Sequence, residues 1–191
     1  MPLDKLFATP VFHVDLPEIA QELIKFQFNV ARSNIESDLS ETTWGDNIST
    51  TFKAGENDAI GKYELGGLLE FVNPVVKYFN DLLYADSNIA MYDSWINYQG
   101  KHQHQRQHTH PGGRISVVYY VQSNGQDGNL TFHPPVANMD QIEPSCDEWN
   151  YSMISYPPVQ GRMFVFPSWV PHSVGDNMTD DTRISIAMNF K

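Results

Sequence analysis

Residues 114–122 read RISVVYYVQ, a short run of β-branched and aromatic residues that is typical of a strand. Four similar runs, separated by turn residues, lie between Ile89 and the end of the chain. They are IAMYDSWINYQ (89–99), NLTFHPP (129–135), RMFVFPSWV (162–170) and RISIAMNF (183–190). Many short strands in series are typical of a β-sandwich or barrel. We therefore predict a mainly β protein with flanking helices, in the form of a double-stranded β-helix, or jelly roll.

The N-terminal half of the chain has a different pattern. Apolar residues recur among polar ones over residues 17–34 and 65–84, which predicts two helices, the second broken or begun again at Pro74. The segment between them, 37–61, is rich in Ser, Thr, Gly and Asn and is predicted to be a loop.

The length of 191 residues suits one domain with a substantial core, and neither a repeat nor a linker divides it. We predict a single domain over residues 1–191. Within it, residues 1–88 form a support of helices and loops, and residues 89–191 form the jelly-roll core.

The composition excludes several classes of partner. The chain carries 23 acidic and 12 basic residues, a formal net charge of −11, which disfavours nucleic acid and anionic membranes. The single cysteine, Cys146, excludes an internal disulfide and fits a reducing compartment. No apolar run approaches the roughly 20 residues that span a bilayer. The first residues do not resemble a signal peptide, so we expect a cytoplasmic protein.

Four of the seven histidines fall in one stretch, HQHQRQHTHP. His108 and His110 are two residues apart, so in an extended chain both side chains leave the same face, as two ligands of one ion must. His172, after FPSWVP, offers a third imidazole, and three ligands with open positions make a catalytic metal site. The ordinary interpretations are a polar surface loop, above all for His102 and His104, and a hydrogen-bonded structural role for His172.

Arg183 and Ser185 lie on one face of the last predicted strand. An arginine that points into an apolar barrel needs an anion, because burying an unpaired guanidinium is costly. A dicarboxylate would meet this need through two parallel hydrogen bonds. The alternative is an arginine at a strand end that reaches an acid on the surface.

Taken in order, these motifs resemble the iron(II)- and 2-oxoglutarate-dependent oxygenases. The segments HTHPGGRISVVYYVQSNGQDGNLTFHPP and QGRMFVFPSWVPHSVGDNMTDDTRISIAMNF are similar to the H-x-D, strand, G-x-T-F, strand, His and Arg series of prolyl-hydroxylase-type enzymes. They resemble more closely a small bacterial and phage branch, in which H-x-H-P, Y-Y-V, F-P-S-W, H-x-V and R-I-S-x-x-x-N-F recur together. The opening LFATPVF resembles the start of that branch. The resemblance covers the whole chain loosely and residues 92–190 specifically, and it implies the cytoplasm of a bacterium or an infected host cell.

The resemblance implies that His108 and His172 bind iron(II), and it places His110 where most of the superfamily has Asp. Replacing a carboxylate by an imidazole removes one negative charge, which weakens the hold on a divalent cation and shifts its redox potential. Three-histidine iron sites occur in other jelly-roll dioxygenases, so oxygen chemistry remains compatible with this departure.

The resemblance also implies the residues that bind the cosubstrate, 2-oxoglutarate. Arg183 and Ser185 match the pair that receives its distal carboxylate, and Tyr98 and Tyr120 match tyrosines that contact it. Each tyrosine, taken alone, also fits an aromatic residue of the core.

The implied function is an iron(II)- and 2-oxoglutarate-dependent dioxygenase of the hydroxylase type. It would use dioxygen and an unidentified small-molecule or peptide substrate, and the chain could form a homodimer. Two other classes stay open, a three-histidine cupin-like metalloenzyme without 2-oxoglutarate and a non-catalytic jelly-roll binding module. Arg183 discriminates against the first, which has no use for it, and iron-dependent consumption of 2-oxoglutarate would discriminate against the second.

Overall fold

The structure is a computed structural model that describes residues 8–42, 46–53, 55, 57–84, 88–135 and 153–191. Cys146 and the first two residues of LFATPVF lie outside the described residues.

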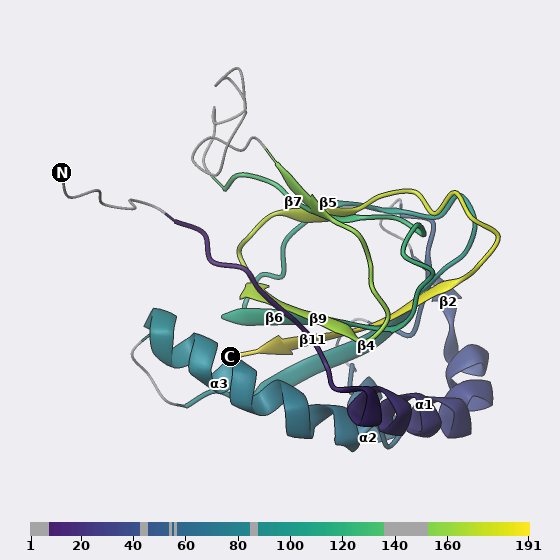
Figure 1. Cartoon of the computed structure of the whole chain (residues 1–191), viewed down its shortest axis with the longest axis horizontal. Helices are drawn as coiled ribbons and strands as arrows, with labels where there is room; N and C mark the ends of the chain where they lie inside the picture. The colour runs from purple at the N-terminus through teal and green to yellow at the C-terminus, as the bar shows by residue number, and fades with distance from the viewer. Residues whose placement is uncertain (1–7, 43–45, 54, 56, 85–87, 136–152) are drawn as a thin grey trace.

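The described strands form two antiparallel sheets that face each other (Figure 1). The larger sheet has the order β1 (Phe12–Asp15), β9 (Arg162–Pro167), β6 (Ile115–Gln122), β11 (Arg183–Phe190), β4 (Met91–Gln99), β3 (Ser49–Thr50) and β2 (Ser40–Glu41). The smaller sheet has the order β5 (Gln105–His108), β10 (His172–Val174), β7 (Leu130–Phe132) and β8 (Ile154–Tyr156). This is the predicted jelly roll, in which the described strands leave two separate sheets and no closed barrel.

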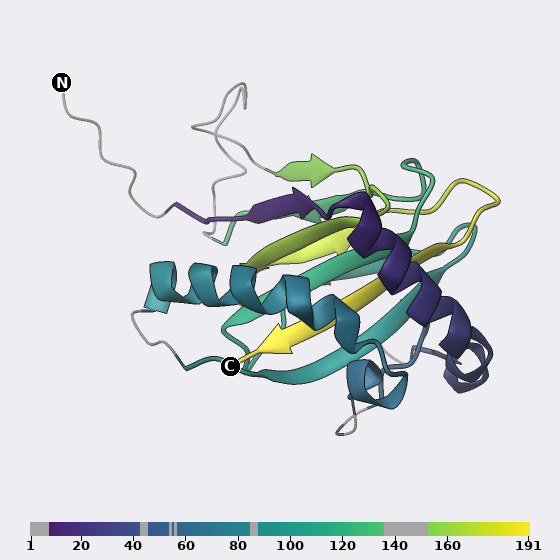
Figure 2. The same ribbon diagram turned by 60° about the horizontal axis from the view of Figure 1, so that its bottom comes forward.

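Helices cover the outer face of the larger sheet, as Figure 2 shows. They are α1 (Glu18–Asp38), α2 (Ala59–Lys62), the 3-10 turn η1 (Gly66–Leu68) and α3 (Leu69–Tyr84). The buried residues of α1 recur every three or four positions, which gives the helix one apolar stripe against the sheet. These residues are Ala20, Ile24, Phe28, Ala31 and Ile35. No helix among the described residues is long and apolar enough to cross a membrane.

Alternation along the strands of the larger sheet separates two hydrophobic clusters. On β6, Val117 and Tyr119 belong to the cluster under the helices. Tyr120 belongs to a second cluster between the two sheets, and the partly buried Val118 packs against it. The inner face of the larger sheet therefore carries apolar side chains in one part and polar side chains in another, and the polar part belongs to the candidate site described below.

Two features of the N-terminal half differ from the sequence-based expectation. The helix α3 continues through Pro74 instead of breaking there. The fixed φ of proline is compatible with a helix, and its ring costs one backbone hydrogen bond. The side chains of Val72 and Val76, before and after Pro74, are buried in the core, and this packing holds the helix together. The strands β1, β2 and β3 also come from this half, which we expected to hold helices and loops; β2 and β3 are only two residues long, too short for a periodic pattern.

Phe28 tests the packing of α1 on the sheet. Its side chain is fully buried and its ring centroid lies 6.4 Å from that of Tyr98. We expect Phe28→Ala to lower the free energy of unfolding by about 3–5 kcal/mol, because it leaves a cavity in the core. Phe26, on the same helix and 67% exposed, is the matched control, and Phe26→Ala should change stability by less than about 0.5 kcal/mol. Urea denaturation followed by circular dichroism measures both; equal losses would contradict this packing.

Candidate metal centre and cosubstrate pocket

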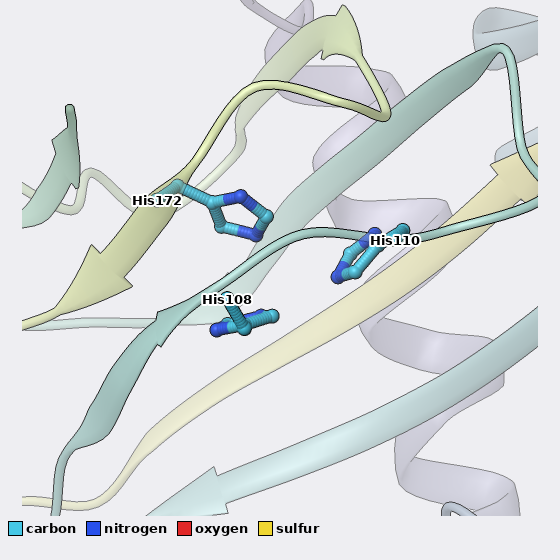
Figure 3. A group of neighbouring side chains, drawn as sticks. All are labelled: His108, His110 and His172. Carbon is cyan, nitrogen blue, oxygen red and sulfur yellow. The ribbon is translucent and has the colours of Figure 1, made fainter. Parts of the chain in front are cut away.

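Three histidine rings come together at one mouth of the jelly roll (Figure 3). His108 ends β5 and His172 begins β10, and the two residues are partners across the smaller sheet. His110 follows in the segment after β5. One ring nitrogen from each lies within 4.8 Å of the other two, and the ring centroids are 4.3, 4.9 and 5.3 Å apart.

In His108 and His172 the ring hydrogen bond uses Nδ1 and leaves Nε2 free. The Nδ1 of His108 lies 2.7 Å from the carbonyl oxygen of Arg106, and the Nδ1 of His172 lies 3.0 Å from that of Val170. A carbonyl can only accept, so each Nδ1 carries the proton and each Nε2 keeps its lone pair. This is the tautomer in which Nε2 binds a metal ion.

His110 is held by a polar network on the larger sheet. Its Nδ1 lies 2.8 Å from the Asn189 Oδ1 on β11 and 2.8 Å from the Ser116 Oγ on β6. The Ser116 hydroxyl donates to the same Asn189 oxygen at 2.7 Å and lies 2.9 Å from the Ser168 Oγ. The Asn189 amide also hydrogen-bonds the Asp93 carboxylate. His110 lies outside the strands, and this network fixes the orientation of its ring. Because the network uses Nδ1, the Nε2 of His110 is also free.

Burial keeps two of the three rings, His110 and His172, neutral before metal binding. It lowers the pKa of His110 to about 4 and the pKa of His172 well below its usual value, and the neighbouring His108 adds to both shifts. Both rings are therefore neutral at pH 7, which is the form that coordinates a metal. Three neutral imidazole nitrogens fit a divalent first-row metal such as iron(II).

Arg183 lies buried on the inner face of β11, with 1% of its surface exposed. Its Nη1 donates to the Gly128 carbonyl at 2.6 Å, its Nη2 donates to the Gln99 Oε1, and its buried Nε has no hydrogen-bond partner. No described carboxylate forms an ion pair with it, since Asp127 accepts from the Ser123 hydroxyl instead. Burial lowers the pKa of Arg183 and the buried Asp127 carboxylate acts against this shift from a distance, so the guanidinium stays charged with no described carboxylate hydrogen-bonded to it.

An inner cavity separates the histidines from this arginine. Its lining includes His108, His110, His172, Tyr120, Arg183 and Ser185. The Arg183 guanidinium carbon lies 5.7 Å from the centre of the Tyr120 ring. The free volume is only about 20 Å³, so a bound oxoacid requires the lining side chains to move apart.

Tyr98 does not join the other predicted site residues. On β4 it faces the helices and packs in the outer cluster beside Phe28, whereas Asn97 and Gln99 face the inner cavity side. Asn97 lines the inner cavity, and Gln99 holds Arg183. The prediction that Tyr98 contacts the cosubstrate is therefore corrected, because alternation along the strand turns it away.

The remaining histidines of the cluster stay outside the metal centre. His102 has a φ of 63° and is exposed at a turn. The Nδ1 of His104 lies 3.2 Å from the Asp176 Oδ1. Both fit the polar-loop interpretation, and neither belongs to the three-histidine group.

A larger vestibule of about 580 Å³ opens onto the histidines from outside. It shares Trp95, Asn97, Gln105, His108 and His110 with the inner cavity. The remainder of its lining includes Thr42, Asp46, Ile48, Thr50, Phe52, Tyr92, Asp93, Arg106 and Asn189. A molecule in the vestibule would therefore lie directly beside the metal centre.

Comparison with known proteins identifies the family. The family model described as "Putative 2OG-Fe(II) oxygenase" matches residues 93–189, and the chain belongs to this family of 2-oxoglutarate- and iron(II)-dependent oxygenases. A search of curated protein sequences found no match.

Solved structures share the fold over nearly the whole chain. A prolyl-4-hydroxylase from Pseudomonas putida is 17% identical over 97% of this chain and 94% of its own, with a TM-score of 0.64. A prolyl hydroxylase from Trichoplax adhaerens, in complex with a hypoxia inducible factor peptide, is 17% identical over 94% and 82%, with a TM-score of 0.67. The epimerase SnoN, in complex with Fe3+, alpha ketoglutarate and nogalamycin RO, is 13% identical over 95% and 78%, with a TM-score of 0.67.

Removal of one histidine tests the metal centre. We expect His172→Ala to abolish tight binding of iron(II), because two imidazoles remain and the buried third ligand is lost. Anaerobic isothermal titration calorimetry with iron(II) measures this. His104→Ala, in the same cluster but outside the three-histidine group, is the control and should bind iron(II) like the parent. Equal binding by all three proteins would contradict the site.

The network around His110 makes a second prediction. Asn189→Ala removes the oxygen that accepts from the His110 Nδ1, so we expect iron(II) affinity to fall about 10- to 100-fold, as for other residues that orient a metal ligand. Asn34→Ala, on the exposed side of α1, is the control. The same calorimetric titration measures the effect, and an unchanged affinity in Asn189→Ala would show that the ring needs no such support.

Proposed function

We propose that the protein is an iron(II)- and 2-oxoglutarate-dependent dioxygenase that hydroxylates its substrate. The observation that carries the proposal is that two groups line one cavity: three histidines with imidazole nitrogens within 4.8 Å of one another, and a buried arginine to which no described carboxylate hydrogen-bonds. Membership of the oxygenase family supports the same function.

In this proposal His108, His110 and His172 bind the iron through their Nε2 atoms. When bound, iron(II) supplies the activation of dioxygen that accompanies oxidative decarboxylation of 2-oxoglutarate. The ligand set carries no charge, so the protein contributes position and a fixed tautomer at each nitrogen. Asn189 and Ser116 supply that orientation for His110.

Arg183 binds the distal carboxylate of 2-oxoglutarate, with Ser185 and Tyr120 beside it. The unpartnered Nε of Arg183 is the donor that is free for the carboxylate. The other guanidinium nitrogens are held by Gly128 and Gln99, which aim the group without neutralising it. A buried cation held only by neutral oxygens is stabilised by an anion that completes its charge balance.

Aromatic side chains make the wall behind His172. The Phe166 ring centroid lies 4.8 Å from that of His172, and the Phe132 centroid lies 6.3 Å from it. Both phenylalanines are buried between the sheets. They keep water from the buried side of the His172 ring, which favours oxidation of a bound substrate over side reactions.

The two other function classes, a metalloenzyme without 2-oxoglutarate and a non-catalytic binding module, make different predictions for this site. A three-histidine metalloenzyme without 2-oxoglutarate has no use for the buried Arg183, and a non-catalytic binding module predicts no iron-dependent consumption of 2-oxoglutarate. For the substrate, both a small molecule and a peptide have precedents in the related structures, which hold nogalamycin RO and a hypoxia inducible factor peptide. The cytoplasmic location and the homodimer stay predictions.

Anaerobic titration of the protein with iron(II) and then 2-oxoglutarate tests the proposal. We expect a visible metal-to-ligand charge-transfer band, and release of succinate and carbon dioxide when oxygen is admitted. Arg183→Lys keeps the charge but loses the planar donor set, so we expect 2-oxoglutarate affinity to fall about 10- to 100-fold, the equivalent of about 1.5–3 kcal/mol.

Arg162→Lys is the matched control. Arg162 is also on the larger sheet but pairs with Asp15 at the surface, with Nε 2.6 Å from Oδ1. Its substitution should leave the titration unchanged. An Arg183→Lys variant that binds 2-oxoglutarate like the parent, or a parent that forms no band, would reject the proposed function.

A further inference from the structure

We infer that the substrate is a small molecule carrying a protonated amine, which Asp93 binds in the vestibule beside the three histidines. The inference rests on the proposed function, since it names the substrate class of the same site.

The charge of the vestibule is unbalanced at one residue. Among the residues that the structure describes, its charged lining side chains are Asp46, Arg106 and Asp93. Asp46 and Arg106 compensate each other: the Arg106 Nε lies 3.6 Å from the Asp46 Oδ1, which also accepts from the Arg106 backbone nitrogen at 2.9 Å. Among the described residues, Asp93 has no such cation and hydrogen-bonds only the neutral side-chain amides of Asn57 and Asn189.

Partial burial makes this imbalance costly. Asp93 is half-buried, and burial raises the pKa of its carboxyl group above the usual value, against the two amide hydrogen bonds. A carboxylate that is withdrawn from water and lacks a cation is stabilised by one that arrives with a ligand. A protonated amine answers this need, because it offers both the charge and hydrogen-bond donors.

Asp93 lies at the correct end of the vestibule for a substrate. It is the partner of Asn189 across β4 and β11, and Asn189 contacts the His110 ring. Trp95, two residues along the same face of β4, has its ring centroid 5.3 Å from that of His110. An amine held by Asp93 therefore has its neighbouring carbon atoms next to the metal centre.

Part of the vestibule wall is apolar. The Phe52 and Trp95 rings meet edge to face with centroids 5.3 Å apart, and Ile48 also lines the space. A hydrocarbon skeleton packs against such a wall. The volume of about 580 Å³ is in the range of cavities that bind small molecules, so the free compound is favoured over a peptide.

Three probes that differ only in their head group test the inference: 4-phenylbutylammonium, 4-phenylbutanol and 5-phenylpentanoate. Each is titrated anaerobically into the protein loaded with iron(II) and 2-oxoglutarate, by calorimetry. We expect the ammonium compound to bind about 10- to 100-fold tighter than the alcohol, as for a charge-assisted hydrogen bond, and the carboxylate to bind weakest. Failure of all three to bind, or an alcohol or carboxylate that binds as tightly, would overturn the inference.

Asp93→Asn removes the charge but keeps an oxygen that can accept from Asn189. We expect this variant to bind the ammonium compound and the alcohol within about threefold of each other, since the charged contact is gone. Asp180→Asn removes the same charge from an exposed residue that pairs with Lys101, and should keep the parent's preference. Loss of the preference in both variants would assign it to net charge and not to Asp93.

Two further measurements separate this inference from the proposed function. The charge-transfer band of iron(II) and 2-oxoglutarate is measured in Asp93→Asn alongside the ammonium preference; a lost band with an unchanged ammonium preference would make Asp93 a support for His110 and overturn its role as the amine site. The same probes titrated into metal-free protein report the vestibule whether or not iron binds. The capped peptide acetyl-Gly-Lys-Gly-amide is the last arm, and tighter binding of it than of the free amine would overturn the small-molecule assignment.

Discussion

The register of β11 against β4 and β6 is the constraint on which the rest of the structure depends. In this register Arg183, Ser185 and Asn189 all turn to the inner face, where their partners on β4 are Gln99, Asn97 and Asp93. The residues between them, such as Ile184 and Ile186, turn to the helices and join the outer core. A slip of one residue would exchange the two faces and send a guanidinium under the helices. The apolar packing of α1 and α3 thus holds the polar half of the strand at the site.

The neutrality of the ligand set changes how charge is distributed in the cavity. As the proposed ligands, three imidazoles bring no negative charge to a divalent ion, and Arg183, the one cation among the described residues that line the inner cavity, adds a positive charge. The compensating charge then has to come from bound ligands, which a dicarboxylate supplies. The oxygen of Asn189 also takes on more importance, because His110 has no strand to position it and depends on this hydrogen bond. A carboxylate ligand would attract the ion by its charge. Here the polar network instead holds the neutral His110 ring in position.

The sequence was sufficient for the architecture and for part of the site. The runs that became β4, β6, β9 and β11 are long and rich in β-branched or aromatic residues, so local pattern alone indicates them. His108 and His110 could be grouped by their spacing, although only β5 is regular strand and His110 lies beyond it. Tyr98 was misplaced because family likeness gave its position in the chain but not its face of the sheet. The short strands β5 and β10 and the contacts of Gln99 arise from long-range pairing, which leaves no periodic signal.

One residue without a side chain holds the arginine that we propose as the anion site. Gly128 has a φ of 101°, a conformation that L side chains rarely adopt, and an added Cβ would collide with the carbonyl of Gly175 in the facing turn. The carbonyl of Gly128 accepts the Nη1 of Arg183. Mutational tolerance at this position is therefore set by backbone shape alone: even alanine, the smallest possible enlargement, would displace the turn and with it the orientation of the guanidinium. A mutational scan for loss of function would therefore identify Gly128, although glycine has no side chain with which to contact a ligand.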